Sequence, residues 1–176
     1  MEQAGDRTDQ PSPVPLRPGD KVLVTGASGF LGSAVARSLL ARGLEVRALI
    51  RPTSPRGNLS GLGFEVVQGD LTDAASLATA LKGMRHLFHV AADYRLWAPD
   101  PSVMTRANVE GTRNLMRAAL KEGVERIVYT SSVATLRLAG ATGPVDETSP
   151  AAPQEAIGVY KRSKTWAERV VEEMVA

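Results

Sequence analysis

Residues 21–32 read KVLVTGASGFLG and join a short apolar run to a loop with three glycines. The run KVLVT, residues 21–25, is rich in β-branched residues and predicts a buried strand. Residues 30–42 carry leucine and valine at intervals of four and stop before Gly43, which predicts a helix that ends at that glycine. The loop therefore lies between a strand and a helix, the setting in which a glycine-rich loop binds phosphate groups.

The glycines of this loop have separate roles in that setting. Gly26 allows a tight turn, Gly29 lets the backbone approach a pyrophosphate, and Gly32 lets helix and strand pack closely. The helix N-terminus offers free N–H groups and a partial positive charge to the phosphates. We therefore predict a dinucleotide site formed by this loop, with a plain turn and helix cap as the alternative. The predicted contact residues are Gly26, Ser28, Gly29, Phe30, Leu31 and Gly32.

The alternation of strand and helix continues along the chain. Further strands are predicted at residues 45–50, 64–68, 86–92 and 126–132, and further helices between Asp73 and Gly83, at 102–122 and at 157–175. Such alternation implies a parallel sheet covered on both faces, with right-handed crossovers. We therefore predict an α/β domain of the Rossmann type over residues 20–176, a doubly wound parallel sheet in three layers.

The first 19 residues differ in composition from the rest of the chain. Four prolines fall between Pro11 and Pro18, and no apolar stretch typical of a signal peptide is present. We predict that residues 1–19 form a disordered tail.

Composition and charge exclude several classes of protein. The chain of 176 residues has no cysteine, which excludes a disulfide scaffold, a cysteine zinc site and a thiol nucleophile. The formal net charge is only +2, and the densest basic cluster, at residues 161–164, is too short for a nucleic-acid-binding arm. His86 and His89 are expected on opposite sides of a strand, which argues against a metal site. No apolar run reaches membrane-spanning length, and we expect a cytoplasmic protein.

Six stretches together resemble a known family in order and spacing. They are TGASGFLG (25–32), GDLTD (69–73), HVAA (89–92), NVEGTRNL (108–115), YTSSVAT (129–135) and YKRSK (160–164). The chain resembles the extended short-chain dehydrogenase/reductases, the NAD-dependent epimerase/dehydratase family. HVAADYRLW and GVYKRSK carry a closer resemblance to hopanoid-associated sugar epimerases and dihydroflavonol-reductase-like proteins.

The resemblance has consequences for the extent of the domain. Members of the family are considerably longer, so we expect an N-terminal part that lacks the last strands and the C-terminal substrate domain. Such a part leaves the outer edge of the fifth strand without a neighbour. We therefore expect weak nucleotide binding, poor turnover and self-association, with a homodimer as one form.

The residue after the second strand bears on the choice of nucleotide. NAD-binding relatives carry an acidic residue where this chain has Ile50, and the next residue is Arg51. A guanidinium can pair with a 2′-phosphate, so we predict NADP(H) in preference to NAD(H), with a solvated loop arginine as the alternative. Arg56 is a second candidate for the same role.

Other cofactor contacts follow from the resemblance alone. It implies that the Asp70 carboxylate accepts a hydrogen bond from the adenine amino group, with the Leu71 N–H alongside, although Asp70 also fits a simple turn. Ala91 and Ala92 are small where a strand end would lie near the cofactor, or are simple packing residues. Asn108 is interpreted as a structural or proton-relay residue at the cofactor site.

Tyr160 and Lys164 lie four residues apart on a predicted helix and so share a face. An ammonium beside a phenol lowers the pKa of the phenol, which suits it to proton transfer near neutral pH. The resemblance implies that Ser132 is the catalytic hydroxyl and that Ser131 lies nearer the nicotinamide; a strand-end cap is the alternative.

The substrate side of the site is less defined in the sequence. Tyr94, Arg95 and Trp97 follow the fourth strand and are candidates for lining a substrate pocket, or for an aromatic lid. The first predicted function is an epimerase/dehydratase acting on a sugar or lipid-linked polyol. The alternatives are an NADPH-dependent carbonyl reductase and a non-catalytic NADP-binding module.

Overall fold

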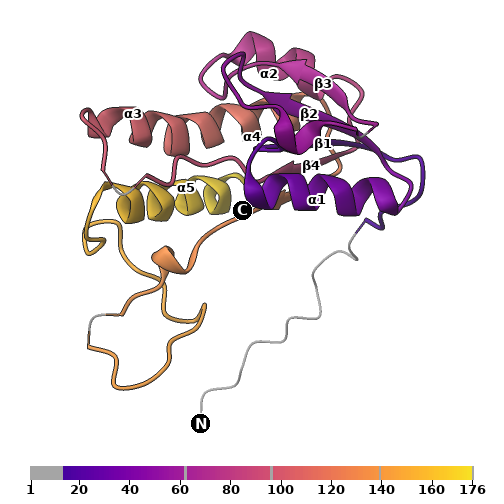
Figure 1. The fold of residues 1–176 in the computed structure, drawn as a ribbon. Coiled ribbons are helices and arrows are strands. Elements are labelled where there is room, and N and C mark those ends of the chain that lie inside the picture. Colours follow the sequence, from indigo (N-terminus) through magenta and orange to yellow (C-terminus); the bar gives the residue numbers. More distant parts are fainter. Residues whose placement is uncertain (1–13, 62, 96, 139, 176) are drawn as a thin grey trace.

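The computed structural model describes residues 14–175 apart from residues 62, 96 and 139. It contains one parallel sheet with the strand order β3-β2-β1-β4-β5 (Figure 1). The strands are β1 (Lys21–Thr25), β2 (Glu45–Ile50), β3 (Glu65–Gln68), β4 (His86–His89) and β5 (Arg126–Tyr129). The order reverses beside β1, so the carboxyl ends of β1 and β4 border the crevice in which this class of sheet binds ligands. The predicted doubly wound Rossmann-type sheet is confirmed.

Helices cover both faces of the sheet. On one face α1 (Phe30–Ala41) packs over alternate residues of β1 and β2, including Val22, Val24 and Val46. On the other face α2 (Ala74–Leu81) and α4 (Gly111–Lys121) pack over Leu23 and Leu87. The helix α5 (Val159–Val175) packs against α4 and against residues 106–110, which directly precede α4. The central strand β1 therefore has apolar side chains buried on both faces of the sheet, as its β-branched sequence predicted.

β4 and β5 end three residues before their predicted ends at residues 92 and 132. The reason at β4 is a side chain of β1: the Thr25 hydroxyl oxygen accepts hydrogen bonds from the N–H groups of Val90 and Ala91, at 3.2 and 3.1 Å. These two amides are therefore withdrawn from the sheet. The chain turns away from the ladder at the crevice.

The predicted single helix over residues 102–122 is wrong in its middle. It consists of α3 (Pro101–Thr105), a π-helical turn η2 (Arg106–Glu110) and α4. The N–H of Gly111 donates to the carbonyl of Arg106, five residues back, so the turn holds one extra residue. Two short 3₁₀ turns, η1 (Gly57–Leu59) and η3 (Val133–Thr135), were not predicted, and α5 begins two residues later than expected.

The amino-terminal tail is described only from Val14 onward; residues 1–13 of the predicted disordered segment lie outside the described residues. The prediction does not hold for residues 14–19. Leu16 packs against the core beneath α1, the Arg126 guanidinium donates to the Val14 carbonyl at 3.1 Å, and the Gly19 N–H donates to the Gly43 carbonyl at 2.8 Å. These contacts order the segment because an apolar side chain finds uncovered apolar surface.

The loop between η3 and α5 extends away from the body of the domain (Figure 1). The two ends of this loop are joined by an antiparallel bridge between Leu136 and Pro150. The Arg137 N–H donates to the Ser149 carbonyl at 2.8 Å. In the described part of the chain, none of the helices is long and apolar enough to cross a membrane.

Candidate active site

The loop from β1 to α1 leaves no room for side chains at two of its glycines. Gly26 has a φ of +72°, and a Cβ there would lie 2.8 Å from the backbone nitrogen of Ala91. A Cβ on Gly32 would lie 2.1 Å from the carbonyl oxygen of Gly26. Gly32 therefore lets the first turn of α1 lie against the backbone directly after β1. The backbone of Ala91 lies against Gly26, and the predicted approach of Ala91 to the cofactor stays a prediction.

The first turn of α1 is left without a side-chain cap. Its N-cap residue is Gly29, which has no side chain to occupy the free N–H groups of the turn that begins at Phe30 and Leu31. Phe30 is 92% exposed and Ser28 is half-buried, so the mouth of the loop is open. A glycine cradle below an uncapped helix N-terminus fits the diphosphate of a dinucleotide.

The segment after β2 closes against this loop. The Asn58 amide donates to the Ser28 carbonyl at 2.9 Å, and the Arg37 guanidinium donates to the Asn58 carbonyl at 3.1 Å. Arg51 opens the segment and is exposed, and Ile50 before it is buried, so the strand end carries no carboxylate. Sequence reasoning missed Asn58, because nothing local marks an asparagine that contacts a loop 30 residues earlier.

Arg51 also lies close to the strand ends on its other side. The pKa of the Asp70 carboxyl is lowered, chiefly by the hydrogen bond from Thr72, and the charge of Arg51 adds to the effect. The pKa of the Asp93 carboxyl is lowered in the same direction, chiefly by the hydrogen bond from Arg95, with a smaller contribution from Arg51. The Arg51 guanidinium is therefore within electrostatic reach of the ends of β3 and β4.

The structure gives Asp70 a turn role. Its Oδ1 accepts hydrogen bonds from the Thr72 N–H at 2.8 Å and from the Thr72 hydroxyl at 2.6 Å. Leu71 is half-buried, and its carbonyl accepts from the Asn114 amide at 3.2 Å. The half-exposed Asp70 carboxylate still lies at the carboxyl edge of the sheet, so the adenine contact stays a prediction. Ala92 is half-buried at the same edge.

A buried chain of hydrogen bonds fixes the end of β4. His89 Nδ1 lies 2.8 Å from the Thr25 hydroxyl, and His89 Nε2 lies 3.0 Å from the Thr112 hydroxyl. Because the Thr25 oxygen already accepts two backbone N–H groups, its hydrogen points to Nδ1, which assigns the proton of the neutral ring to Nε2. Burial, with a smaller contribution from the Lys164 charge, lowers the pKa of His89 to about 3. The sequence analysis left His89 without a role; His86, on the other side of the strand, lies 3.2 Å from Asp20.

Asn108 acts as a clamp between three segments. Its Oδ1 accepts from the Asp93 N–H at 2.7 Å, and its Nδ2 donates to the Asp93 carbonyl and to the Ser163 hydroxyl, both at 2.9 Å. Its side-chain groups are thus used within the protein, which favours the structural interpretation over proton relay. The contacts fix the chain after β4 to α5.

Two of the predicted catalytic side chains, those of Tyr160 and Ser132, come together between β5 and α5. The Tyr160 hydroxyl donates to Ser132 Oγ at 3.4 Å, a long contact of the kind that shortens when substrate binds. Ser132 Oγ also accepts from the Ala134 N–H at 3.1 Å and so caps η3. Both interpretations of Ser132, as a cap and as a hydroxyl beside Tyr160, therefore apply.

Lys164 is buried, and its hydrogen bonds go to residues of β5 and the segment after it. Its ammonium donates to the Tyr129 hydroxyl at 2.8 Å and to the Thr130 carbonyl at 3.0 Å. Burial lowers the pKa of Lys164 to about 8, and the nearby Glu168 carboxylate acts in the opposite direction. The Tyr129 ring also packs against His89, with ring centroids 5.5 Å apart. Tyr129 was missed because its partner lies 35 residues further along the chain.

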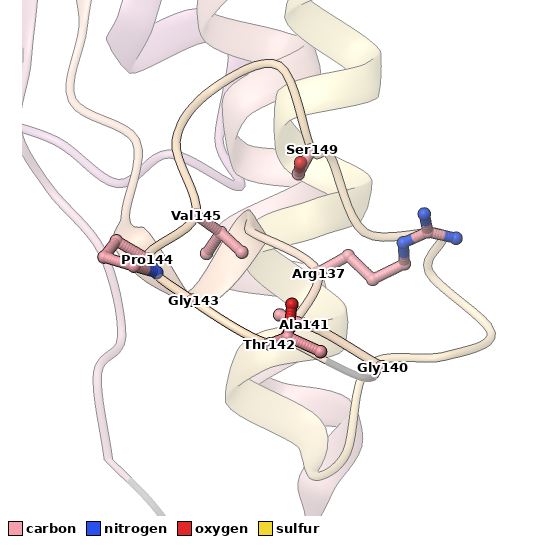
Figure 2. A pocket seen from close by; sticks show the side chains of 8 residues that line it. All are labelled: Arg137, Gly140, Ala141, Thr142, Gly143, Pro144, Val145 and Ser149. Carbon is pink, nitrogen blue, oxygen red and sulfur yellow. The ribbon is translucent and has the colours of Figure 1, made fainter.

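The candidate substrate residues lie on exposed loops. Tyr94 is 78% and Trp97 is 75% exposed, while Arg95 forms an ion pair with Asp93. A separate hollow of about 400 Å³ opens within the β5–α5 loop, with Arg137 as its charged lining residue (Figure 2). This hollow does not include Tyr160 or Lys164 in its lining. Among the described residues, no group of three or more His, Asp or Glu side chains could hold a metal ion.

The fold and the site together define a class of protein. A doubly wound sheet, a glycine cradle at its first crossover and a Tyr-x-x-x-Lys helix after its fifth strand are those of a nicotinamide-dinucleotide-binding domain. Residues 22–176 match the model of the NAD dependent epimerase/dehydratase family. The chain belongs to this family, as the sequence motifs predicted.

Known proteins match the chain over most of its length. A dihydroflavonol 4-reductase-like protein of Synechocystis sp. is 45% identical over 150 residues, which are 85% of this chain and 43% of that protein. The crystal structure of gox2253 superposes with a TM-score of 0.83 at 57% identity, covering 89% of this chain and 48% of the other.

The UDP-glucose 4-epimerase of Thermus thermophilus, solved in complex with NAD, gives a TM-score of 0.76 at 31% identity. The match covers 87% of this chain and 50% of the epimerase chain. The chain therefore spans about half the length of the relatives it matches.

Proposed function

We propose that this chain is the dinucleotide-binding and catalytic part of an NADP(H)-dependent oxidoreductase that reduces a carbonyl group or oxidises the corresponding carbinol. The observation that carries the proposal is the pairing of the Tyr160 hydroxyl with Ser132 at 3.4 Å, one helical turn before the buried Lys164 ammonium. The name of the 45% identical relative, a dihydroflavonol reductase, supports reduction.

Each side chain has a distinct part in this chemistry. A bound nicotinamide dinucleotide supplies or takes up the hydride. Tyr160 gives its phenolic proton to the substrate oxygen during reduction, and removes that proton in the reverse direction. Ser132 donates a hydrogen bond to the same oxygen as negative charge grows on it. Lys164 supplies the buried positive charge of the site, held by its hydrogen bond to the Tyr129 hydroxyl. These roles divide proton transfer, oxyanion stabilisation and charge among three residues.

The preference for NADP(H) rests on Arg51. Its guanidinium follows a strand end without a carboxylate, in a segment that Asn58 ties to the phosphate loop. A 2′-phosphate at that strand end would pair with Arg51, whereas a carboxylate there would repel it. Arg56, at the start of η1 in the same segment, is the second candidate.

A second function is supported by the family match and by the NAD-bound 4-epimerase structure. In an epimerase the same Tyr160 would serve oxidation of a carbinol and then reduction of the resulting carbonyl group. The substrate predicted for that case is a sugar or a lipid-linked polyol. The homodimer, the cytoplasmic location, and the cofactor roles of Ala92 and Asp70 also stay predictions.

Titration of the purified chain with NADPH and NADH, followed by nicotinamide fluorescence, tests the proposal. We expect tighter NADPH binding, and we expect Arg51→Glu to weaken NADPH binding by about tenfold or more. Arg42→Glu, exposed at the far end of α1, is the control and should bind NADPH as the unaltered chain does. An unchanged NADPH dissociation constant in Arg51→Glu would show that Arg51 is a bystander.

Turnover separates the two functions. A reductase consumes one NADPH for each ketone reduced, whereas an epimerase interconverts its substrates without net consumption of the nucleotide. Loss of turnover in Tyr160→Phe, with nucleotide affinity unchanged, is expected in either case.

A further inference from the structure

The Lys164 ammonium is buried with neutral partners. The residue is 3% exposed, and its two hydrogen-bond acceptors are the Tyr129 hydroxyl and the Thr130 carbonyl. A buried charge is costly unless an opposite charge lies near it. The proposed chemistry needs this ammonium in its charged form, so the source of the balancing charge matters.

Four titratable side chains face Lys164 from the elements packed around it. They are His89 from β4, Tyr129 from β5, and Tyr160 and Glu168 from α5, one turn before and one turn after the lysine. His89 is neutral because burial lowers its pKa to about 3. Burial raises the pKa of Tyr129, and the Glu168 and Tyr160 charges add to that rise, so Tyr129 is also neutral. Glu168 is therefore the carboxylate of this group.

Glu168 is held in place by the strand that carries the candidate catalytic serines. Its Oε1 accepts a hydrogen bond of 2.6 Å from the Ser131 hydroxyl. It is half-buried, and it lies four residues after Lys164 on α5, on the same face of the helix. The carboxylate is thus anchored to the end of β5, and its residue lies one helical turn after Lys164.

We propose that Glu168 is a positioning residue, whose carboxylate supplies the counter-charge to the Lys164 ammonium and fixes the Ser131 hydroxyl at the end of β5. This inference rests on the proposed function, because that function gives the charge of Lys164 its importance. It deepens the proposal by adding a residue that acts through Lys164 and Ser131. Removal of the Glu168 charge should leave the fold in place and lower the pH at which Lys164 loses its proton.

The test is a direct titration of Lys164 by NMR. The chain contains five lysines, so side-chain ¹³Cε labelling gives few signals, and Lys164→Arg identifies the one of interest. In the unaltered chain we expect a midpoint near pH 8. Glu168→Gln keeps the shape and an acceptor for Ser131 but removes the charge, and should lower the midpoint by about one pH unit. Glu168→Asp keeps the charge and should restore most of the difference.

A matched control and a measurement on the unaltered chain complete the test. Glu173→Gln removes an exposed carboxylate from the same helix and should leave the Lys164 midpoint where it was. If Glu168→Gln does not fold, the Glu168 carboxyl signal of the unaltered chain should still shift at the Lys164 midpoint. An unchanged midpoint in folded Glu168→Gln, or a Glu168 signal that does not respond, overturns the proposal. Neither readout needs nucleotide or turnover, so failure here is distinct from failure to bind NADPH.

Discussion

The two halves of the site are built from different materials. The dinucleotide half, from β1 through α1 to the segment after β2, is formed largely by backbone: Gly26 and Gly32 provide space, and an uncapped helix provides N–H groups. The catalytic half, between β5 and α5, is formed by side chains that bury a charge among tyrosines and hydroxyls. The first half leaves no room for a side chain at Gly26 or Gly32, whereas the second buries a charge whose cost depends on the groups around it.

This difference teaches where each half is vulnerable. The dinucleotide half depends on excluded volume, so the smallest addition should disrupt it. The catalytic half depends on electrostatic balance, so its groups lower stability in proportion to the charge that they bury. Two substitutions and one change of pH test this contrast, and they are given in order of expected size.

The largest effect is expected for Gly32→Ala. The added Cβ would lie 2.1 Å from the Gly26 carbonyl oxygen, so the loop backbone has to move. We expect a loss of about 3 kcal/mol or more in the free energy of unfolding, together with loss of NADPH binding. Urea unfolding and fluorescence titration measure the two quantities. Gly143→Ala, which has open space around it, should change neither; a folded Gly32→Ala that binds NADPH normally would contradict the excluded-volume argument.

A smaller effect of opposite sign is expected for Lys164→Met. Burial lowers the pKa of Lys164 to about 8, below the value of an unfolded chain, so the charged form destabilises the domain at neutral pH. The methionine should stabilise the domain by about 1–3 kcal/mol at pH 7, net of the two hydrogen bonds lost, while turnover of the active protein falls.

The pH dependence of Lys164→Met provides its control. The unfolded chain binds the Lys164 proton more tightly than the folded one, so the unaltered domain gains stability between about pH 8 and the unfolded pKa near 10.5. The advantage of the methionine should shrink over the same range. Lys161→Met, on the exposed side of α5, should show neither effect; destabilisation by Lys164→Met at pH 7 would contradict the prediction.

An effect no larger than that of Lys164→Met is expected from mild acid. The pKa of His89 is about 3 in the folded state, against an ordinary value of 6.5. Below about pH 6.5 the unfolded state therefore binds a proton at His89, whereas the folded state does not. Stability should therefore fall by about 2 kcal/mol between pH 7 and pH 5, as measured by urea unfolding at each pH. His89→Gln should lower stability at pH 7 but remove most of this slope. A slope that persists in His89→Gln would assign the effect to other groups.

The contrast also decides what the sequence could predict. The order of strands and helices, the glycine cradle and the Tyr160–Lys164 pair are legible because each depends on residues a few positions apart. Tyr129, His89 and Glu168 were missed because their roles arise from contacts between β4, β5 and α5, which no local pattern encodes. The early end of β4 was missed for the same reason, since Thr25 withdraws two amides from a strand 65 residues later.

The spacing of the loop glycines marks Gly32 as a position of close packing, but it does not identify the Gly26 carbonyl oxygen as the atom that a side chain there would meet. The turn role of Asp70 was visible in the sequence as an alternative, since a hydrogen bond to the second residue along is local.

The π-helical turn at Arg106–Glu110 sets the phase of the helices around it. Each residue of an α-helix advances about 100° around the axis, so one extra residue rotates everything after it by that angle. The turn thereby allows Asn108 to reach the Asp93 backbone and Ser163, while Leu115 and Ala119 still face the sheet. Deletion of one residue here would preserve either the Asn108 contacts or the packing of Leu115 and Ala119 on the sheet, but not both. The contacts that join the loop after β4 to α5 therefore depend on the one additional residue in this turn.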